Sequence, residues 1–217
     1  MSCWWISTLQ AVKPFVGLAK LKTCKYQGSD TFLWRGFIDI FEMLSTDISR
    51  PIPFRVIQPL VEDSARKMNM RCNEQQDVAE FYLQLIVPFL GESCLTHEIE
   101  ICKSLMCLNC ENNSIVESST FGILSVAVHT LSIVNCLQEF FKDEVISGLR
   151  CDECGKTQCK KTIFTRIITC PKLLVVQLLR FGAVDEQLVK LNSDISPTME
   201  IDLSKFCTFS LGITQLF

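Results

Sequence analysis

Two cysteine pairs, Cys107-Leu-Asn-Cys110 and Cys151-Asp-Glu-Cys154, lie 40 residues apart and are the most informative feature of this 217-residue chain. A Cys-x-x-Cys turn brings two thiolates together, and two such turns supply the four soft ligands of a tetrahedral structural zinc ion. The separation is longer than in a single compact ribbon, so each pair is expected on its own hairpin. The sequence therefore predicts a Zn²⁺ site at these four cysteines, with Cys159 and Cys102 as reserve ligands. The alternative is chance pairing, since the chain holds 13 cysteines.

Cysteine usage and charge disfavour several classes of protein. An odd number of cysteines, metal-like spacings and an amino terminus without a basic leader segment favour a reduced compartment, the cytoplasm or the nucleus, over a disulfide framework. No apolar run reaches the roughly 18 residues of a membrane helix, so we expect no membrane partner. The net charge of −3 disfavours nucleic acid as a partner, because nucleic-acid binders usually carry a basic face.

Two helices are predicted near the amino terminus. Residues 4–12 form the first, which Pro14 stops, and Cys3 lies at its start. There the unpaired backbone amides and the helix dipole favour a thiolate, whereas the alternative is a small residue buried beside two tryptophans. Residues 31–44 form the second helix. The prolines after it are predicted to mark a loop; they are Pro51, Pro53 and Pro59.

A third helix is predicted to begin at Asn73, with Gln76 three residues on, as in a capping box. Its apolar residues recur at helical spacing; they are Val78, Phe81, Tyr82, Leu85, Ile86 and Phe89. Asp77, Glu80 and Gln84 fall on the opposite side. A charged stripe of this kind is usually a solvated face, which is the simplest interpretation of these three residues.

The second half of the chain is predicted to be rich in strands. Between the cysteine pairs, residues 121–128 and 131–137 are rich in β-branched and aliphatic side chains. After the second pair, residues 162–169 and 173–181 form two long strands, of which the second is apolar almost throughout and is expected to be central and covered on both faces. Helices followed by strands predict an α+β fold.

Four segments occur in an order that is typical of one family; they are Cys3–Gln10 (CWWISTLQ), Gln75–Phe81 (QQDVAEF), Cys136–Lys156 and Cys170–Phe181 (CPKLLVVQLLRF). The chain resembles the ubiquitin-specific proteases, which are papain-like cysteine peptidases that remove ubiquitin. The first segment is similar to the cysteine box, the second to a Gln-Gln-Asp-x-x-Glu-Phe motif, the third to the approach to the second zinc knuckle, and the last to a strand ending in Leu-x-Arg-Phe. The resemblance runs from Cys3 to roughly Phe206.

This resemblance implies an α+β, papain-like fold of three parts: a helical thumb over about residues 1–95, zinc-ribbon fingers over 96–165 and a partial β palm over 166–217. It implies that Cys3 is the nucleophile, which attacks the carbonyl after the terminal glycine of ubiquitin and forms a thioester that water hydrolyses. It also makes Gln75, Asp77 and Glu80 candidate contacts for the basic tail of ubiquitin.

The chain departs from the family pattern in its acid–base partners. The family's histidine box is expected near or after residue 217, and the only histidines present, His97 and His129, do not match its position. The oxyanion-stabilising asparagine expected before Cys3 has no counterpart, and Ile6 replaces the asparagine usual within the cysteine box. We therefore expect a catalytic domain that is incomplete at both ends and poorly active by itself.

Two functions remain open at this stage. The chain is a deubiquitinase, or a relative acting on an interferon-induced ubiquitin-like modifier, or else it is a non-catalytic module that binds such a modifier. Both give it ubiquitin or a ubiquitin-like protein, and ubiquitinated proteins, as partners. A zinc-ribbon module for nucleic acid is disfavoured by the charge.

Overall fold

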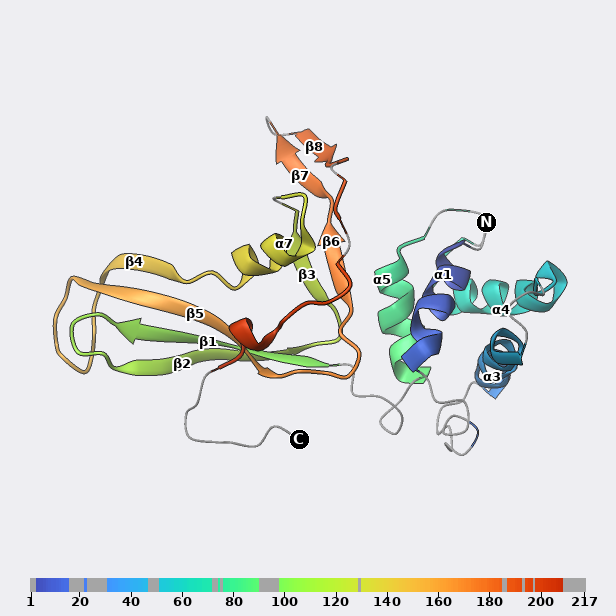
Figure 1. Ribbon diagram of the computed structural model, residues 1–217, viewed down its shortest axis with the longest axis horizontal. Coiled ribbons are helices and arrows are strands. Elements are labelled where there is room, and N and C mark those ends of the chain that lie inside the picture. Colours follow the sequence, from blue (N-terminus) through green and yellow to red (C-terminus); the bar gives the residue numbers. More distant parts are fainter. Residues whose placement is uncertain are drawn as a thin grey trace. The chain divides into compact units, whose positions relative to one another are not determined.

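The computed structural model describes residues 3–15, 22, 31–46, 51–71, 74, 76–89, 98–128, 130–184, 187–192, 194–196 and 198–208. The chain divides into two compact units, Met1–His97 and Glu98–Phe217. The described part of the first is helical, whereas the second is built mainly of strands (Figure 1). None of the helices in the described ranges is both long enough and apolar enough to cross a bilayer.

Helices make up the described part of the unit Met1–His97. They are α1 (Cys3–Val12), the 3₁₀ turn η1 (Lys13–Phe15), α3 (Thr31–Thr46), α4 (Phe54–Lys67), α5 (Val78–Phe81) and the π-helical turn η2 (Tyr82–Ile86). The helices predicted at residues 4–12 and 31–44 are therefore confirmed, each with a slightly longer span.

Aromatic side chains hold these helices together. Trp4 packs edge-on against Phe81 with ring centroids 4.9 Å apart, which joins α1 to α5, and Trp5 packs against Phe37 of α3 at 5.7 Å. Such pairs add about 0.5–1.5 kcal/mol each beyond the area they bury. The indole N–H of Trp5 also donates to Ser64 Oγ at 3.2 Å, so α1 is tied to α4 as well. These contacts fix the helix that begins with Cys3.

The prediction of a loop at the prolines is wrong for residues 54–67. Pro53 precedes the first turn of α4, and Pro59 lies inside the helix. A proline in a helix interior costs about 3 kcal/mol because its ring clashes with the preceding turn and it lacks an N–H. Burial along one face outweighs this cost; the buried residues are Ile57, Leu60, Val61, Ser64 and Ala65.

The predicted start of the third helix is also wrong. Helix α5 begins at Val78, and the Asp77 carboxylate caps it by accepting the backbone N–H of Ala79 at 2.7 Å. The Gln76 amide donates to the Arg71 carbonyl at 2.7 Å and takes no part in a capping box. Asn73 lies outside the described residues. Aspartate is a better cap than its neighbours because its short side chain reaches the free amides directly.

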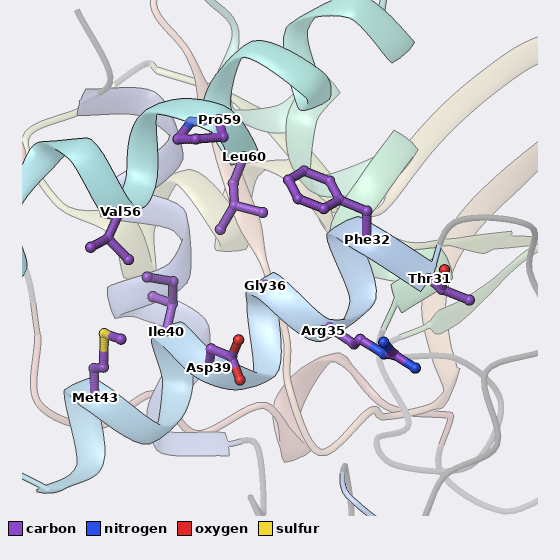
Figure 2. Close-up of a pocket in the computed structure, with 10 residues that line it drawn as sticks. All are labelled: Thr31, Phe32, Arg35, Gly36, Asp39, Ile40, Met43, Val56, Pro59 and Leu60. Atoms are coloured by element: carbon purple, nitrogen blue, oxygen red, sulfur yellow. The ribbon is translucent and has the colours of Figure 1, made fainter.

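Helices α3 and α4 approach closely at Gly36 and border a groove of about 400 Å³ (Figure 2). A Cβ atom at Gly36 would lie 2.2 Å from one methyl carbon of Leu60 and 2.8 Å from the other. We therefore predict that Gly36→Ala lowers the free energy of unfolding by about 1–3 kcal/mol through overpacking. Denaturant unfolding measures the effect, and the same change in a Leu60→Ala background is the control. An equal cost in both backgrounds would contradict the steric origin.

The described part of the unit Glu98–Phe217 contains two antiparallel arrangements of strands and one parallel pair. A four-stranded antiparallel sheet has the order β2-β1-β5-β4, with β1 (Ile99–Cys107), β2 (Asn113–Phe121), β4 (Glu144–Leu149) and β5 (Cys159–Thr169). A parallel pair is formed by β3 (Leu124–Ala127) and β6 (Val176–Leu179). A hairpin is formed by β7 (Phe181–Val184) and β8 (Gln187–Lys190). The described residues also form α7 (Ile133–Phe140) and the 3₁₀ turn η3 (Ser204–Phe206) (Figure 1).

The core of this unit lies where the sheet meets the parallel pair. Its buried residues are Ile99, Ile101, Leu124, Val126, Cys136, Leu137, Phe141, Ile167 and Phe206. Strand β1 contributes its first half and β5 its second half, so the remaining half of each strand extends away from the core toward the cysteines. The strand predicted at residues 162–169 is confirmed within β5.

Two strand predictions are wrong in part. Residues 131–137 were expected in a strand, but Ile133–Phe140 form α7, because Cys136, Leu137 and Phe141 recur at helical rather than alternating spacing on the core. The strand expected over residues 173–181 is interrupted at Arg180, giving β6 and β7. Strand β6 is half-exposed and pairs only with β3 among the described residues, so it is not central.

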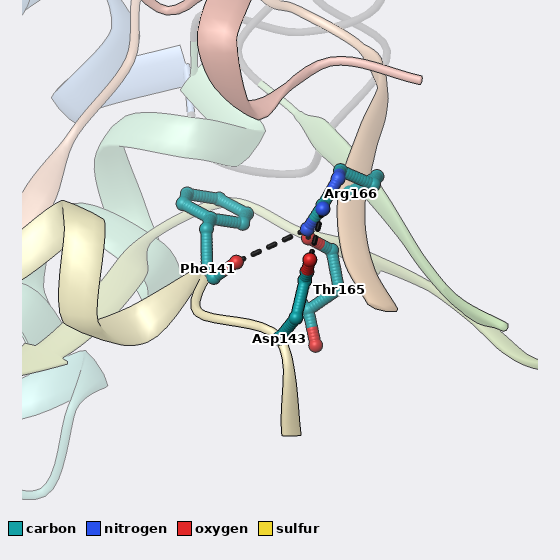
Figure 3. A network of polar contacts seen from close by, with 4 residues as sticks. All are labelled: Phe141, Asp143, Thr165 and Arg166. Carbon is teal, nitrogen blue, oxygen red and sulfur yellow. Dashed lines mark hydrogen bonds and ion pairs between the residues drawn. The ribbon is translucent and has the colours of Figure 1, made fainter. Parts of the chain in front are cut away.

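Arg166 fastens the four-stranded sheet to the segment that joins α7 to β4. Its guanidinium donates to Asp143 Oδ1 at 2.5 Å and to the carbonyls of Phe141 and Thr165 at 3.1 and 2.9 Å (Figure 3). The same group lies 5.3 Å from the centre of the Phe164 ring. This network sets the position of the edge strand β4, which leads to the second cysteine pair.

Candidate functional site: a four-cysteine centre and a helix-terminal cysteine

The first cysteine pair lies in the turn that joins β1 to β2. Cys107 ends β1, its carbonyl accepts the N–H of Glu111 at 2.8 Å, and its own N–H donates to the Asn112 carbonyl at 2.9 Å. The N–H of Leu108 donates to the Lys160 carbonyl at 3.0 Å, which fixes the turn to β5. Glu111 has a φ of 57°, in the left-handed region. The chain thereby closes tightly around both sulfurs.

The second pair lies in a matching turn before β5. The N–H of Cys151 donates to the Lys156 carbonyl at 2.9 Å, and Gly155, directly after Cys154, has a φ of 69°. Glu111 has the same place directly after Cys110. A left-handed residue here lets the following amides turn back toward the sulfurs, and glycine adopts it without strain. The glycine after Cys154 was visible in the sequence as a signal for this turn, whereas nothing marked Glu111.

The structure brings the four predicted cysteines together. The sulfurs of Cys107, Cys110, Cys151 and Cys154 all lie within 4.8 Å of one another, and those of Cys110 and Cys151 are 3.7 Å apart. Cys107 and Cys151 are buried, Cys154 is half-buried and Cys110 is exposed. Four ligands at a Zn–S distance of about 2.3 Å in a tetrahedron have sulfurs about 3.8 Å apart. The cluster could therefore hold a metal ion after a small contraction.

Backbone amides prepare two of these thiols for ligation. The N–H of Asn109 lowers the pKa of Cys107 to about 6, and the N–H of Lys156 lowers the pKa of Cys154, with burial opposing both shifts. A thiolate rather than a thiol is the metal ligand, so these amides favour the binding state. Sequence reasoning missed both amide donors, because a backbone donor leaves no signature in residue identity.

Cys159, one of the reserve ligands, lies against the cluster. It is fully buried with Cys107 and Cys151, and burial raises the pKa of its thiol. The other reserve candidate, Cys102, is buried in β1 and is not part of this group. The structure thus favours Cys159 over Cys102 as a fifth thiol near the centre.

Cys3 is the first residue of α1 and is exposed to solvent. Its carbonyl accepts the hydroxyl of Ser7 at 2.7 Å, and the two residues after it, Trp4 and Trp5, are buried. The alternative interpretation of Cys3 as a small buried residue is therefore wrong: the tryptophans fill the core and leave the thiol outside. His97 and His129 both lie outside the described residues.

The acidic residues of the second motif lie on one exposed face of α5. Asp77 caps the helix, and the carboxylate of Glu80 accepts the side-chain amide of Gln84 at 2.9 Å. Gln75 lies outside the described residues. The face is solvated, as expected. Its two carboxylates have further oxygen lone pairs that can accept hydrogen bonds from a basic partner.

Comparison with known proteins identifies the class of protein that this fold and site define. The family model of ubiquitin carboxyl-terminal hydrolase matches residues 1–214, so the chain belongs to the ubiquitin carboxyl-terminal hydrolase family. It is 28% identical over 91 residues to human ubiquitin carboxyl-terminal hydrolase 30, an alignment covering 39% of this chain and 18% of that protein. It is also 28% identical over 102 residues to ubiquitin carboxyl-terminal hydrolase 25 of Arabidopsis thaliana, covering 45% of this chain and 15% of that one.

Solved structures show the same fold. A SAGA Ubp8/Sgf11/Sus1/Sgf73 DUB module bound to ubiquitin aldehyde matches with a TM-score of 0.74 and 21% identity, covering 95% of this chain and 51% of that one. A SAGA DUB module bound to monoubiquitin matches with a TM-score of 0.69 and 22% identity, covering 95% and 49%. The predicted α+β fold of the ubiquitin-specific proteases is confirmed. The matches span about half of the solved chains and under a fifth of the curated relatives.

Proposed function

We propose that this chain is part of a thiol-dependent deubiquitinase, which hydrolyses the peptide or isopeptide bond after the terminal glycine of ubiquitin. The observation that carries this proposal is the exposed Cys3 at the start of α1, in a chain of the ubiquitin carboxyl-terminal hydrolase family. The thiol is open to a substrate from solvent, as a nucleophile must be. The compartment that suits reduced thiols is the cytoplasm or the nucleus.

The chemistry divides into two steps at Cys3. The sulfur forms a bond to the carbonyl carbon of the terminal glycine of ubiquitin, and the bond from that carbon to the leaving amine breaks once the amine receives a proton. Water then hydrolyses the thioester and frees the thiol. Both steps need a residue that moves protons, which in this enzyme class is a histidine. Because neither His97 nor His129 matches the family position, we propose that residues 1–217 by themselves carry out little turnover.

We propose Zn²⁺ as the ion of the four-cysteine centre, held by Cys107, Cys110, Cys151 and Cys154. Four thiolates with no carboxylate among them form the donor set that zinc takes in structural sites. The centre lies at the ends of β1 and β5 and joins two turns that few apolar side chains support. Its role is to fold this end of the sheet.

Ubiquitin, or a ubiquitin-like modifier, is the partner we propose, and two of the structural neighbours are complexes with ubiquitin or its aldehyde. The acidic face of α5 is the candidate contact for a basic segment of that partner. The variant Asp77→Asn keeps the helix cap, because asparagine caps a helix as well as aspartate does, but it removes the negative charge. The variant therefore tests ubiquitin binding without loss of the cap.

The variant Asp77→Asn/Glu80→Gln is predicted to weaken ubiquitin binding about 3- to 30-fold at low salt, and less at high salt, because screening reduces the lost attraction. Calorimetric titration at two salt concentrations measures it. The matched control is Glu62→Gln/Asp63→Asn, which removes the same charge from α4. Equal affinities for the wild type and the α5 variant would show that the face is only solvated.

A non-catalytic module that binds ubiquitin or an interferon-induced ubiquitin-like modifier is the second candidate, since the histidines do not match the family position. A ubiquitin that carries a carboxy-terminal electrophile separates the two candidates. Covalent labelling that is lost in Cys3→Ala supports the deubiquitinase. Tight binding without labelling supports the module.

A further inference from the structure

We infer that α3 is the contact surface of a homodimer, in which the groove between α3 and α4 of one copy receives α3 of a second copy. The groove lies within the unit Met1–His97 and has a volume of about 400 Å³ (Figure 2). Pockets of this size take up whole small ligands, so the groove has room for an aromatic side chain. This dimer does not depend on the proposed enzymatic function.

The groove has a buried floor and exposed apolar ends. The floor is formed by Ile40 and Leu60 beside Gly36, and both side chains are buried. Phe32 and Met43 also line the groove, but they are 53% and 40% exposed and lie about three turns apart on α3. An apolar groove with exposed apolar side chains at both ends is the kind of surface that a partner covers.

Two opposite charges lie between these apolar ends. Arg35 and Asp39 line the groove, are exposed and follow one another by one turn of α3 (Figure 2). Neither forms an ion pair with another described residue of the chain. The order along α3 is therefore apolar, basic, acidic, apolar. These charges favour a partner that presents the same two charges in the reverse order.

The chain itself supplies the reverse order when α3 is turned around. In a two-fold dimer, residue i of one copy contacts residue j of the second, and j contacts i. Two antiparallel α3 helices with the axis level with Phe37 place Arg35 beside the second copy's Asp39, and the same pair forms again across the axis. Phe32 then lies beside the second copy's Met43. This self-complementarity favours a second copy of the chain over an unrelated protein as the occupant.

Charge reversal followed by mixing tests the dimer. Sedimentation equilibrium of the 217-residue chain is expected to show monomers and dimers in equilibrium. Arg35→Glu and Asp39→Arg are each expected to weaken the dimer at least about 10-fold, because either change places like charges at both contacts across the axis. An equimolar mixture of the two variants is expected to restore dimers, since the acid introduced at position 35 then faces the base introduced at position 39. The control is Arg71→Glu, which reverses an exposed charge outside the groove.

The apolar contact is tested separately by Phe32→Ala. Because Phe32 is more than half exposed in one copy, its truncation is expected to weaken the dimer at least about 10-fold while the helical circular dichroism signal is kept. Phe15→Ala is the matched control, because Phe15 is also exposed and does not line the groove.

Three results would overturn the proposed dimer. The first is a wild-type chain that stays monomeric at every concentration, whether or not another protein binds the groove. The second is a dimer that Arg35→Glu and Asp39→Arg leave unchanged, because a different surface would then hold the copies together. The third is a mixture of these two variants that stays monomeric although both keep the wild-type helical signal.

Discussion

Removal of the metal is expected to unfold the four-stranded sheet while the helices of Met1–His97 stay folded. Structural zinc contributes an apparent 10–16 kcal/mol or so in small zinc domains, which matches or exceeds the roughly 5–15 kcal/mol that stabilises a typical domain. The cysteine end of the sheet has little else to hold it, because its buried cluster consists of cysteines. Chelation, or the variant Cys151→Ala, is therefore expected to abolish the sheet.

The positions of the tryptophans allow the helical unit to be followed separately in this experiment. All three tryptophans, Trp4, Trp5 and Trp34, belong to Met1–His97, so tryptophan fluorescence reports that unit alone. Far-UV circular dichroism should lose its strand contribution on chelation, while the tryptophan emission changes little. Cys151 is chosen because it is a buried member of the four-cysteine centre, and Cys170→Ala, which removes an exposed thiol outside the cluster, is the control. An unchanged sheet signal in protein shown by elemental analysis to be metal-free would refute the structural role.

The second large effect concerns turnover. Residues 1–217 on their own are expected to hydrolyse a ubiquitin bearing a fluorogenic carboxy-terminal amide at close to the uncatalysed rate. A missing general base lowers rates by about 10²–10⁴, and a missing oxyanion donor by about 10²–10³ more. Labelling by an electrophilic ubiquitin, which needs only the thiolate, is expected to proceed slowly and to depend on Cys3.

Extension of the chain with a histidine box, and addition of an asparagine-bearing segment before Cys3, are expected to restore turnover. Cys170→Ala is again the matched control, since it removes an exposed thiol without touching α1. Efficient hydrolysis by residues 1–217 that is lost in Cys3→Ala would show this prediction to be wrong. In that case the variants His97→Gln and His129→Gln would show which histidine supplies the base.

The sequence predicted those features that short motifs encode. The spacing of the cysteines predicted their convergence, and the periodic apolar residues of Thr31–Thr46 predicted that helix. It failed where tertiary packing overrides a local signal. Pro59 lies inside α4 because the buried face of the helix outweighs the proline, and residues 133–140 form a helix although their composition favours a strand.

The sequence predicted the candidate site less well where its properties depend on backbone atoms. The amides that lower the pKa of Cys107 and Cys154 come from Asn109 and Lys156, whose side chains are irrelevant to that effect. The close packing of Cys159 on Cys107 depends on how β5 aligns with β1, which local sequence does not encode. The exposure of Cys3 follows from the burial of Trp4 and Trp5.

Strands β1 and β5 each have one end in the apolar core, at Ile101 and Ile167, and the other end in the cysteine centre, at Cys107 and Cys159. A pair of strands that is held in place at both ends does not fray. The backbone amides between these two ends are those from Lys103 to Leu105 and from Ile163 to Thr165. They should therefore exchange with solvent deuterium only when the whole sheet opens. The half-exposed middle of each strand would then show the slow exchange of a protein interior, for as long as the metal is bound.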